Sequence, residues 1–308
     1  VGLYANLLGI NLNNGRGNSA VYDLSGGRLN LGSGGINNQA SKSIRIGNAT
    51  LGAFGNWTST KSITLTGTGP LTVDTLDSAN GTTARNISLS GGITETAPTG
   101  IIKVGAGTLG VAGSISYTGD TVIDGGKFLP GPSLTSSKMI VNAGGSLGAG
   151  TVTTAGLSVV GDIELNGGNL ALRVGTPFDQ LDALSVNVVS ASTIEIVPSQ
   201  QLNVDDEFVV LKYASLDGLG FAGLSPATLP NPHYSASLID DTVSSQVILK
   251  VTGADSLIWT GSDSSTWDVN STSNWKLVSA LPATTSSKFY DSDVIIFDDS
   301  SSVGNITL

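Results

Sequence analysis

Paired glycines that recur along the chain constrain its fold more than any other feature of the sequence. The pairs are Gly26-Gly27, Gly91-Gly92, Gly125-Gly126, Gly144-Gly145 and Gly167-Gly168. Four of the five residues that stand two positions before a pair are apolar, and so are four of the five that stand two positions after it. This unit predicts a strand, a tight bend and a second strand, because glycine takes the positive φ that such a bend needs.

Short runs in which apolar and polar residues alternate lie between these bends. Examples are residues 43–46, 62–66, 86–89, 162–165 and 193–197. Each run predicts a strand with one buried face, and each is closed within a few residues by Gly, Asn, Asp or Ser. Patterning with the period of a helix is hard to find, so the sequence predicts an all-β fold.

The spacing of the glycine pairs selects between all-β architectures. Successive pairs lie 65, 34, 19 and 23 residues apart. Three of these intervals fit one or three turns of about 20 residues each, and the interval of 34 requires an insertion. We therefore predict a β-solenoid, a parallel β-helix in which apolar side chains stack in ladders along a continuous core. Tandem β-sandwiches, which also have short strands at regular spacing, are the alternative.

Composition excludes several classes of function. The chain of 308 residues has no cysteine and one histidine, so it forms no disulfide and no thiolate metal site. Its 14 basic and 24 acidic residues give a net charge of -10. Because a phosphate-binding surface needs an excess of positive charge, we expect no nucleic-acid partner. No run of about 18 apolar residues exists, so we expect no membrane span.

The composition and strand pattern of the sequence change twice along the chain, and these changes predict three regions. Residues 1–175 carry the glycine repeats and are predicted to form the solenoid. Residues 176–256 have longer apolar strands and much of the proline, and are predicted to form irregular β coils or a small β-sandwich. Residues 257–308 contain three tryptophans and are predicted to form a β segment that opens a further module or contacts a neighbour.

A family resemblance lies in residues 103–129. Lys103, the run Gly-Ala-Gly-Thr-Leu at 105–109, Tyr-Thr-Gly at 117–119 and Gly-Gly-Lys-Phe-Leu at 125–129 resemble the autotransporter-associated β-strand repeat of bacterial surface proteins. The chain departs from that repeat at Asp120, where a second glycine is usual. Residues 257–299 resemble the segment that opens a new module in long, repetitive members. The resemblance implies a right-handed β-helix at the cell surface or in the matrix, and it implies no catalytic residues.

Three evenly spaced tryptophans are the candidate contact residues. Trp259, Trp267 and Trp275 are eight residues apart, in a segment interrupted by Gly and Ser. We predict that they form the aromatic core of a small β unit. A platform on which sugar rings stack and a set of interface anchors are the alternatives.

The titratable residues show little of the patterning that is typical of a catalytic site. His233 is bracketed by prolines and has no accompanying pattern of nucleophile and orienting group, so we predict a surface loop residue. The carboxylates cluster at 205–207, 240–241, 291/293 and 298–299. Neighbouring acids on a strand point to opposite faces, so we predict solvated loop acids rather than a catalytic pair. Ca²⁺ is the alternative, with Asp291, Asp293 and the 298–299 pair as ligands. We predict no other cofactor.

These observations together predict a structural module outside the cell or on a bacterial cell surface. Its strand-like termini are expected to join neighbouring copies of the chain or adjoining repeats, end to end, in a rod, fibre or filament. An adhesin or carbohydrate-binding protein is the first alternative. A glycan-cleaving enzyme on a β-helix is the second, and we expect no enzymatic activity.

Overall fold

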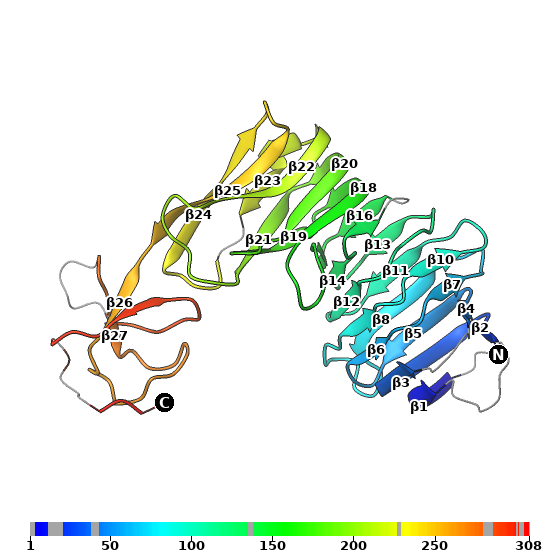
Figure 1. The fold of residues 1–308 in the computed structure, drawn as a ribbon, viewed down its shortest axis with the longest axis horizontal. Coiled ribbons are helices and arrows are strands. Elements are labelled where there is room, and N and C mark those ends of the chain that lie inside the picture. The colour runs from blue at the N-terminus through cyan, green and yellow to red at the C-terminus, as the bar shows by residue number, and fades with distance from the viewer. Residues whose placement is uncertain are drawn as a thin grey trace.

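The chain folds into an all-β structure dominated by parallel strands (Figure 1). The computed structural model describes residues 4–11, 21–37, 43–134, 138–226, 229–279, 286–299, 301 and 305–307. In these residues the only helix is the 3-10 turn η1 (Gly220–Gly223). No helix in this part of the chain is long and apolar enough to cross a membrane.

Most strands belong to one of three columns, in each of which successive strands lie parallel. The first column contains ten strands or parts of strands: β1 (Tyr4–Asn11), β3 (Gly27–Asn37), β5 (Ala49–Ala53), β8 (Leu71–Asp77), β11 (Ile101–Val104), β13 (Thr121–Ile123), β16 (Met139–Asn142), β18 (Leu157–Asn166), β20 (Gln180–Ser190) and β22 (Glu207–Gly218). The second column starts from the end of β3 and contains β6 (Trp57–Ser59), β9 (Ile87–Leu89), β12 (Thr108–Val111), β14 (Gly126–Leu129), β17 (Gly145–Leu147), β19 (Asn169–Val174), β21 (Ser192–Pro198) and β23 (Leu224–Pro226).

The third column begins with four short strands and ends in the first halves of long ones. Its members are β2 (Val21–Leu24), β4 (Ser43–Ile46), β7 (Ile63–Leu65), β10 (Ile93–Glu95), a bridge at Ile115, β15 (Ser133–Leu134), and the starts of β18, β20 and β22. The chain visits the third, first and second columns in that order and then repeats. Along the first column, paired residues step from Leu71 to Ile101, Thr121, Met139 and Ile163, which are intervals of 30, 20, 18 and 24 residues.

The glycine pairs mark bends, as predicted, but not the same bend. Every pair contains a residue with positive φ, for example Gly92 at 83° and Gly126 at 62°. The pair at 26–27 leads from β2 to β3, the pair at 91–92 leads from β9 to β10, and the other three lead from the first column to the second. The insertion inferred from the 34-residue interval is therefore wrong, because residues 91–92 and 125–126 occupy different bends.

One hydrophobic core runs through all three columns. It extends from Leu31 to Val251, and it includes Leu89 and Leu165, both 0% exposed. Leu24 is only partly buried but packs against the same core. Apolar side chains lie over apolar side chains in successive layers, as in the ladder of Leu109, Phe128, Leu147 and Leu170 in the second column. Each such buried side chain contributes about 1.5–3 kcal/mol of transfer free energy.

The parallel columns end in an antiparallel hairpin. β22 pairs with β25 (Gln246–Ala254), which in turn pairs with β24 (Tyr234–Asp241), both antiparallel. The core of the columns continues through residues 176–251 and into this hairpin. The hairpin leads towards the C-terminal sheet in Figure 1.

The C-terminal residues form a second, smaller sheet with its own core. Its strands are β26 (Ser256–Trp259), β27 (Trp275–Leu277), β28 (Ser286–Ser287) and β29 (Val294–Ile296). Leu257, Trp259 and Trp275 are its fully buried residues. A parallel bridge between Thr266 and Thr307 ties the end of the chain to this unit. Of the two termini predicted to be strand-like, residues 1–3 and 308 lie outside the described residues.

Candidate functional site

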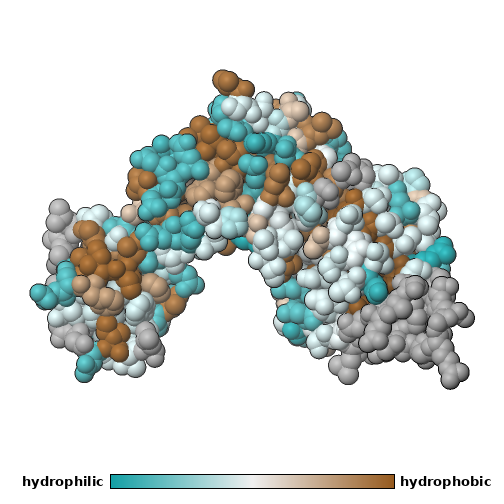
Figure 2. Space-filling view, in the orientation of Figure 1, coloured by the Kyte–Doolittle hydropathy of each residue, from teal (hydrophilic) through white to brown (hydrophobic). Residues whose placement is uncertain are grey.

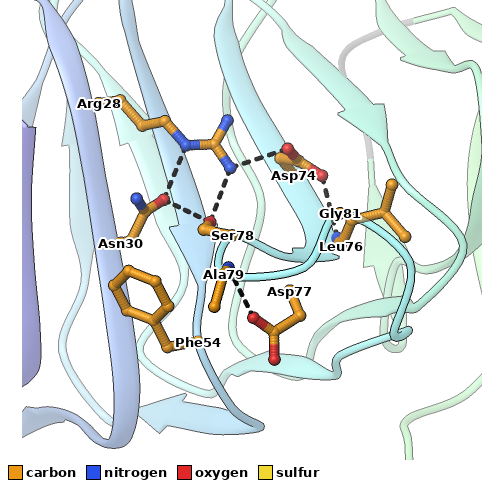
Figure 3. Close-up of a pocket in the computed structure, with 9 residues that line it drawn as sticks. All are labelled: Arg28, Asn30, Phe54, Asp74, Leu76, Asp77, Ser78, Ala79 and Gly81. Carbon is orange, nitrogen blue, oxygen red and sulfur yellow. Dashed lines mark hydrogen bonds and ion pairs between the residues drawn. The ribbon is translucent and has the colours of Figure 1, made fainter.

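A cavity lined by both polar and apolar groups lies where β3, β5 and β8 stack in the first column (Figure 3). It has a volume of about 570 Å³, and its lining includes Arg28, Asn30, Phe54, Asp74 and Ser78. The side chains of Arg28 and Asp74 are 26% and 19% exposed, so both are held in the wall and reach solvent. Side chains of both charge types and several hydrogen-bonding groups thus line one cavity.

The guanidinium of Arg28 organises the wall of this cavity. Its Nη2 lies 2.8 Å from Asp74 Oδ2 and 2.9 Å from Ser78 Oγ, and both contacts are hydrogen bonds that Arg28 donates. Its Nε donates to Asn30 Oδ1 at 2.7 Å, and Ser78 Oγ donates to the same oxygen at 2.8 Å. A charged donor and a charged acceptor that share several neutral partners form a more rigid unit than an exposed ion pair.

Gly52 leaves the space that the Arg28 side chain needs to extend from β3 to Asp74 in β8. Arg28 lies in β3 and Asp74 in β8, and β5 stands between them in the column. Gly52 of β5 pairs with Asn30, and a Cβ at Gly52 would meet Arg28 Nη2 at 2.7 Å and Asn30 Oδ1 at a still shorter distance. Any side chain at this position would therefore displace the guanidinium from its partners.

A loop after β8 closes one side of the cavity and explains the 30-residue interval. It turns at Asp77, whose Oδ1 accepts the backbone N–H of Ala79 at 2.8 Å. Arg85 Nε donates to Asp77 Oδ2 at 2.9 Å. The hydrogen bond from Arg85, followed by the one from the Ala79 backbone, holds the pKa of Asp77 below its usual range. Both acids beside the cavity are thus paired with an arginine.

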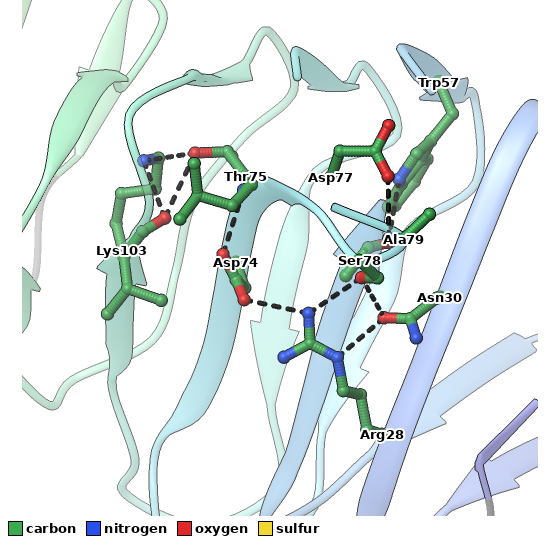
Figure 4. A network of polar contacts seen from close by, with 12 residues as sticks. Arg28, Asn30, Trp57, Asp74, Thr75, Asp77, Ser78, Ala79 and Lys103 are labelled. Atoms are coloured by element: carbon green, nitrogen blue, oxygen red, sulfur yellow. Dashed lines mark hydrogen bonds and ion pairs between the residues drawn. The ribbon is translucent and has the colours of Figure 1, made fainter. Parts of the chain in front are cut away.

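Lys103, which lies in β11 and is the first residue of the segment 103–129, is buried behind this wall (Figure 4). Its Nζ is surrounded by four acceptor oxygens within hydrogen-bonding distance: Thr75 Oγ1 at 2.8 Å, Val104 O at 3.0 Å, and the carbonyl oxygens of Gly105 and Gly125, both at 2.8 Å. Thr75, Gly105 and Gly125 belong to three successive layers of the stack. The side chain therefore connects three layers at one bend.

The environment of Lys103 opposes its charge. Burial lowers the pKa of Lys103 to about 7, and the carboxylate of Asp74 partly counteracts this effect. The amine is 0% exposed, so it cannot reach a ligand in the cavity. Its position fits a structural cross-link rather than a nucleophile.

The three predicted contact tryptophans meet in the core of the C-terminal unit. The ring of Trp275 lies between the other two, with centroids 5.0 Å from Trp259 and 5.5 Å from Trp267, both edge to face. Trp259 and Trp275 are 1% and 0% exposed, so neither ring has an open face for a sugar. Trp267 is partly buried against the same core. The indole N–H groups of Trp259 and Trp275 are buried with no hydrogen-bond acceptor.

His233 is not a surface residue, so that prediction is wrong. Its side chain is 5% exposed, and it joins the end of the columns to the C-terminal unit. Nδ1 lies 2.8 Å from Asp293 Oδ1, and Nε2 lies 2.9 Å from Ser287 Oγ. This is the connectivity of a Ser-His-Asp triad, in which the carboxylate fixes the imidazole tautomer. No local pattern indicates this arrangement, because Ser287 and Asp293 are 54 and 60 positions away from His233.

The carboxylates do not gather as a metal site would require. In the described residues no three His, Asp or Glu side chains come together in a way that could hold a metal ion. Asp293, one of the predicted Ca²⁺ ligands, has a fully buried carboxylate that accepts hydrogen bonds from Asn231 Nδ2 at 2.6 Å and from the Tyr290 backbone at 2.7 Å. Its oxygens are therefore already occupied by protein donors.

No protein-family model matches the sequence. No curated protein matches it either.

Proposed function

We propose that this chain is a structural, non-enzymatic module of a bacterial cell surface or extracellular matrix. In this proposal the three columns form a right-handed β-solenoid that serves as a segment of a rod, fibre or filament. The observation that carries the proposal is the single core from Leu31 to Val251, in which apolar side chains lie over apolar side chains in successive layers. A core of this form resists bending and local opening along its whole length, because each layer is held from both sides.

Polar cross-links between layers support the same role. Lys103 bonds to three successive layers, and Arg28 connects β3 to β8 across β5. Both contacts run along the axis of the stack, as the backbone hydrogen bonds between layers do. They add directional restraints to a core whose apolar packing is not directional.

The surface of the stack suits an extracellular scaffold. In Figure 2 the N-terminal layers are mostly pale, the colour of residues with intermediate hydropathy, whereas teal and brown residues gather over the later layers. The full chain has 12% charged residues and no cysteine. A surface of short, weakly polar side chains permits close lateral packing of rods, and the absence of thiols makes the fold independent of redox conditions.

We propose that copies of the chain, or adjoining repeats, associate end to end. β1 pairs with β3 on one side, and the described residues supply no strand on its other side. A parallel edge of this kind is a template for a further layer. The first column alone spans about 43 Å at about 4.8 Å per layer, so each added copy extends a rod by a length visible in the electron microscope.

Negative-stain microscopy of the 308-residue chain over a range of concentrations tests this proposal. We expect elongated particles that lengthen with concentration, together with a growing high-mass fraction in size-exclusion chromatography. Asn6→Pro within β1 disrupts the edge strand by removing one of its backbone N–H groups, and is expected to reduce the lengthening while leaving thermal unfolding of the later layers unchanged. Discrete monomers at every concentration would overturn the end-to-end association.

A further inference from the structure

We propose that the cavity bounded by β3, β5, β8 and the loop after β8 is a binding site for a neutral oligosaccharide. At about 570 Å³ it lies within the range of about 300–1,000 Å³ that is typical of small-ligand sites. The proposal goes beyond the scaffold function and does not depend on it, since a rod needs no such cavity.

The polar groups in the wall of the cavity are held in place by hydrogen bonds to one another, before any ligand binds. Arg28, Asn30 and Ser78 are joined by hydrogen bonds of 2.7–2.9 Å, and Asp74 fixes the far end of the guanidinium. Asp74 is itself held by the backbone N–H of Leu76, which donates to its Oδ1 at 2.9 Å. Groups held in this way bind a ligand without first losing conformational entropy.

The charges around the cavity cancel, and this favours a neutral ligand. Arg28 is paired with Asp74, and Asp77 is paired with Arg85, so the two acids and two bases cancel. A phosphate or carboxylate ligand would need uncompensated positive charge. A sugar hydroxyl both donates and accepts, so it can bond to an ion pair and to neutral amide or hydroxyl groups in one wall.

The same cavity also contains an aromatic side chain. Phe54 contributes an apolar ring beside Asn30 and Ser78 (Figure 3). Its backbone N–H donates to Leu31 O at 2.8 Å, which fixes the residue at the edge of β5. An aromatic face next to fixed polar groups matches the two sides of a pyranose, which has an apolar C–H face and a rim of hydroxyls. Phe54 is only half-buried, so the core of the stack does not account for its ring.

Saturation-transfer NMR with defined sugars tests the proposal. The probes are cellohexaose, laminarihexaose, chitohexaose and mannohexaose, with oligogalacturonate as the acidic comparison. We expect at least one neutral probe to bind with a Kd of about 1 mM or tighter. Phe54→Ala is expected to weaken that binding about tenfold, and Tyr22→Ala, which alters a 40% exposed aromatic residue outside the cavity, is expected to leave it unchanged.

A second cavity variant tests the proposal in case Phe54→Ala does not fold. Ala79 is exposed at the rim, so Ala79→Trp fills the cavity without disturbing the core and should abolish binding. Circular dichroism verifies the fold of each variant. The proposal is overturned if no neutral probe binds at about 5 mM, or if only oligogalacturonate binds. It is equally overturned if binding survives both cavity variants, or is lost with Trp267→Ala alone.

Discussion

Nδ1 of His233 lies 2.8 Å from Oδ1 of Asp293, and this contact joins two parts of the chain that have separate hydrophobic cores. His233 precedes β24 at the end of the columns, whereas Asp293 precedes β29 in the C-terminal unit. Asn231 donates to the same carboxylate, and the Tyr234 hydroxyl donates to the backbone oxygen of Ser292. The orientation of the C-terminal unit is thus set by buried hydrogen bonds as well as by the covalent link through β25 and β26.

Removal of the imidazole should loosen the C-terminal unit and leave the columns intact. His233→Ala deletes two hydrogen bonds and leaves the buried carboxylate of Asp293 with fewer donors, a loss of about 1–3 kcal/mol. We expect amide hydrogen exchange in β29 to accelerate about tenfold or more, while β16 and β18 keep their protection.

Val243→Ala is the matched control for this variant. Val243 is 95% exposed at the tip of the β24–β25 hairpin, so its truncation should change neither region. Equal acceleration in β16 and β29 would show that the two parts unfold together and that the contact is not a local junction.

The Ser287–His233–Asp293 connectivity should not react as a hydrolase centre. The imidazole is 5% exposed and lies edge to face against Tyr290, with ring centroids 5.3 Å apart, so a substrate has no approach to the atom that would take the proton. We expect a fluorophosphonate probe to label the chain no more than it labels Ser287→Ala. Labelling that disappears in Ser287→Ala would contradict the non-enzymatic proposal.

The buried amine of Lys103 should give the stack a pH-dependent stability. In the folded chain its pKa is about 7, whereas an unfolded lysine has a pKa of about 10.4. Between these values the unfolded state binds the extra proton, so the free energy of unfolding rises with pH by up to about 1.4 kcal/mol per unit. Below pH 7 both states are protonated and this contribution to the slope vanishes.

Denaturant unfolding from pH 6 to pH 10 checks the effect as a difference between variants. Lys103→Met should lack the rise that the natural chain shows. Lys138→Met, at a side chain that is 42% exposed and paired with Glu164, should retain it. An identical slope in the natural chain and Lys103→Met would mean that the amine stays charged in the fold.

Local pattern was sufficient to predict the strands and the bends of this fold. Alternation at 43–46 and 86–89 predicted β4 and β9, and the glycine pairs predicted residues with positive φ. Leu24, Leu89 and Leu165, which stand two positions before three of the glycine pairs, all lie in or against the single core. These features depend on neighbours a few residues apart, which a sequence displays directly.

Contacts between layers could not be predicted in the same way. The partners Arg28 and Asp74 are 46 residues apart, and their contact depends on the register of β3, β5 and β8. Residues 78–86 resemble any polar connection, although they form one side of the cavity. The glycine pairs also could not reveal that the strands form three columns, because the bends between different columns carry the same short motif.

Truncation of a ladder residue should cost far more than truncation of an exposed residue of the same type. Leu165 is 0% exposed in the first column, so Leu165→Ala should lower the free energy of unfolding by about 2–5 kcal/mol. Leu184 is 66% exposed, and Leu184→Ala should change it by about 0.5 kcal/mol or less. Similar losses in thermal or denaturant unfolding would contradict a core confined to the inner wall.

Glycine is required at a column bend both for its backbone angle and for the close approach of the layer below. Gly126 has φ 62°, and a Cβ there would lie against the carbonyl oxygens of Gly105 and Gly107. Gly126→Ala should therefore destabilise the stack by more than the about 1 kcal/mol expected from φ alone. Gly156→Ala is the control, because a Cβ at Gly156 meets no atom within 4 Å. Restricting the unfolded chain should make that variant as stable as the natural protein or slightly more so. Equal thermal unfolding temperatures for the two variants would show that the layers are not as close at residue 126 as the structure places them.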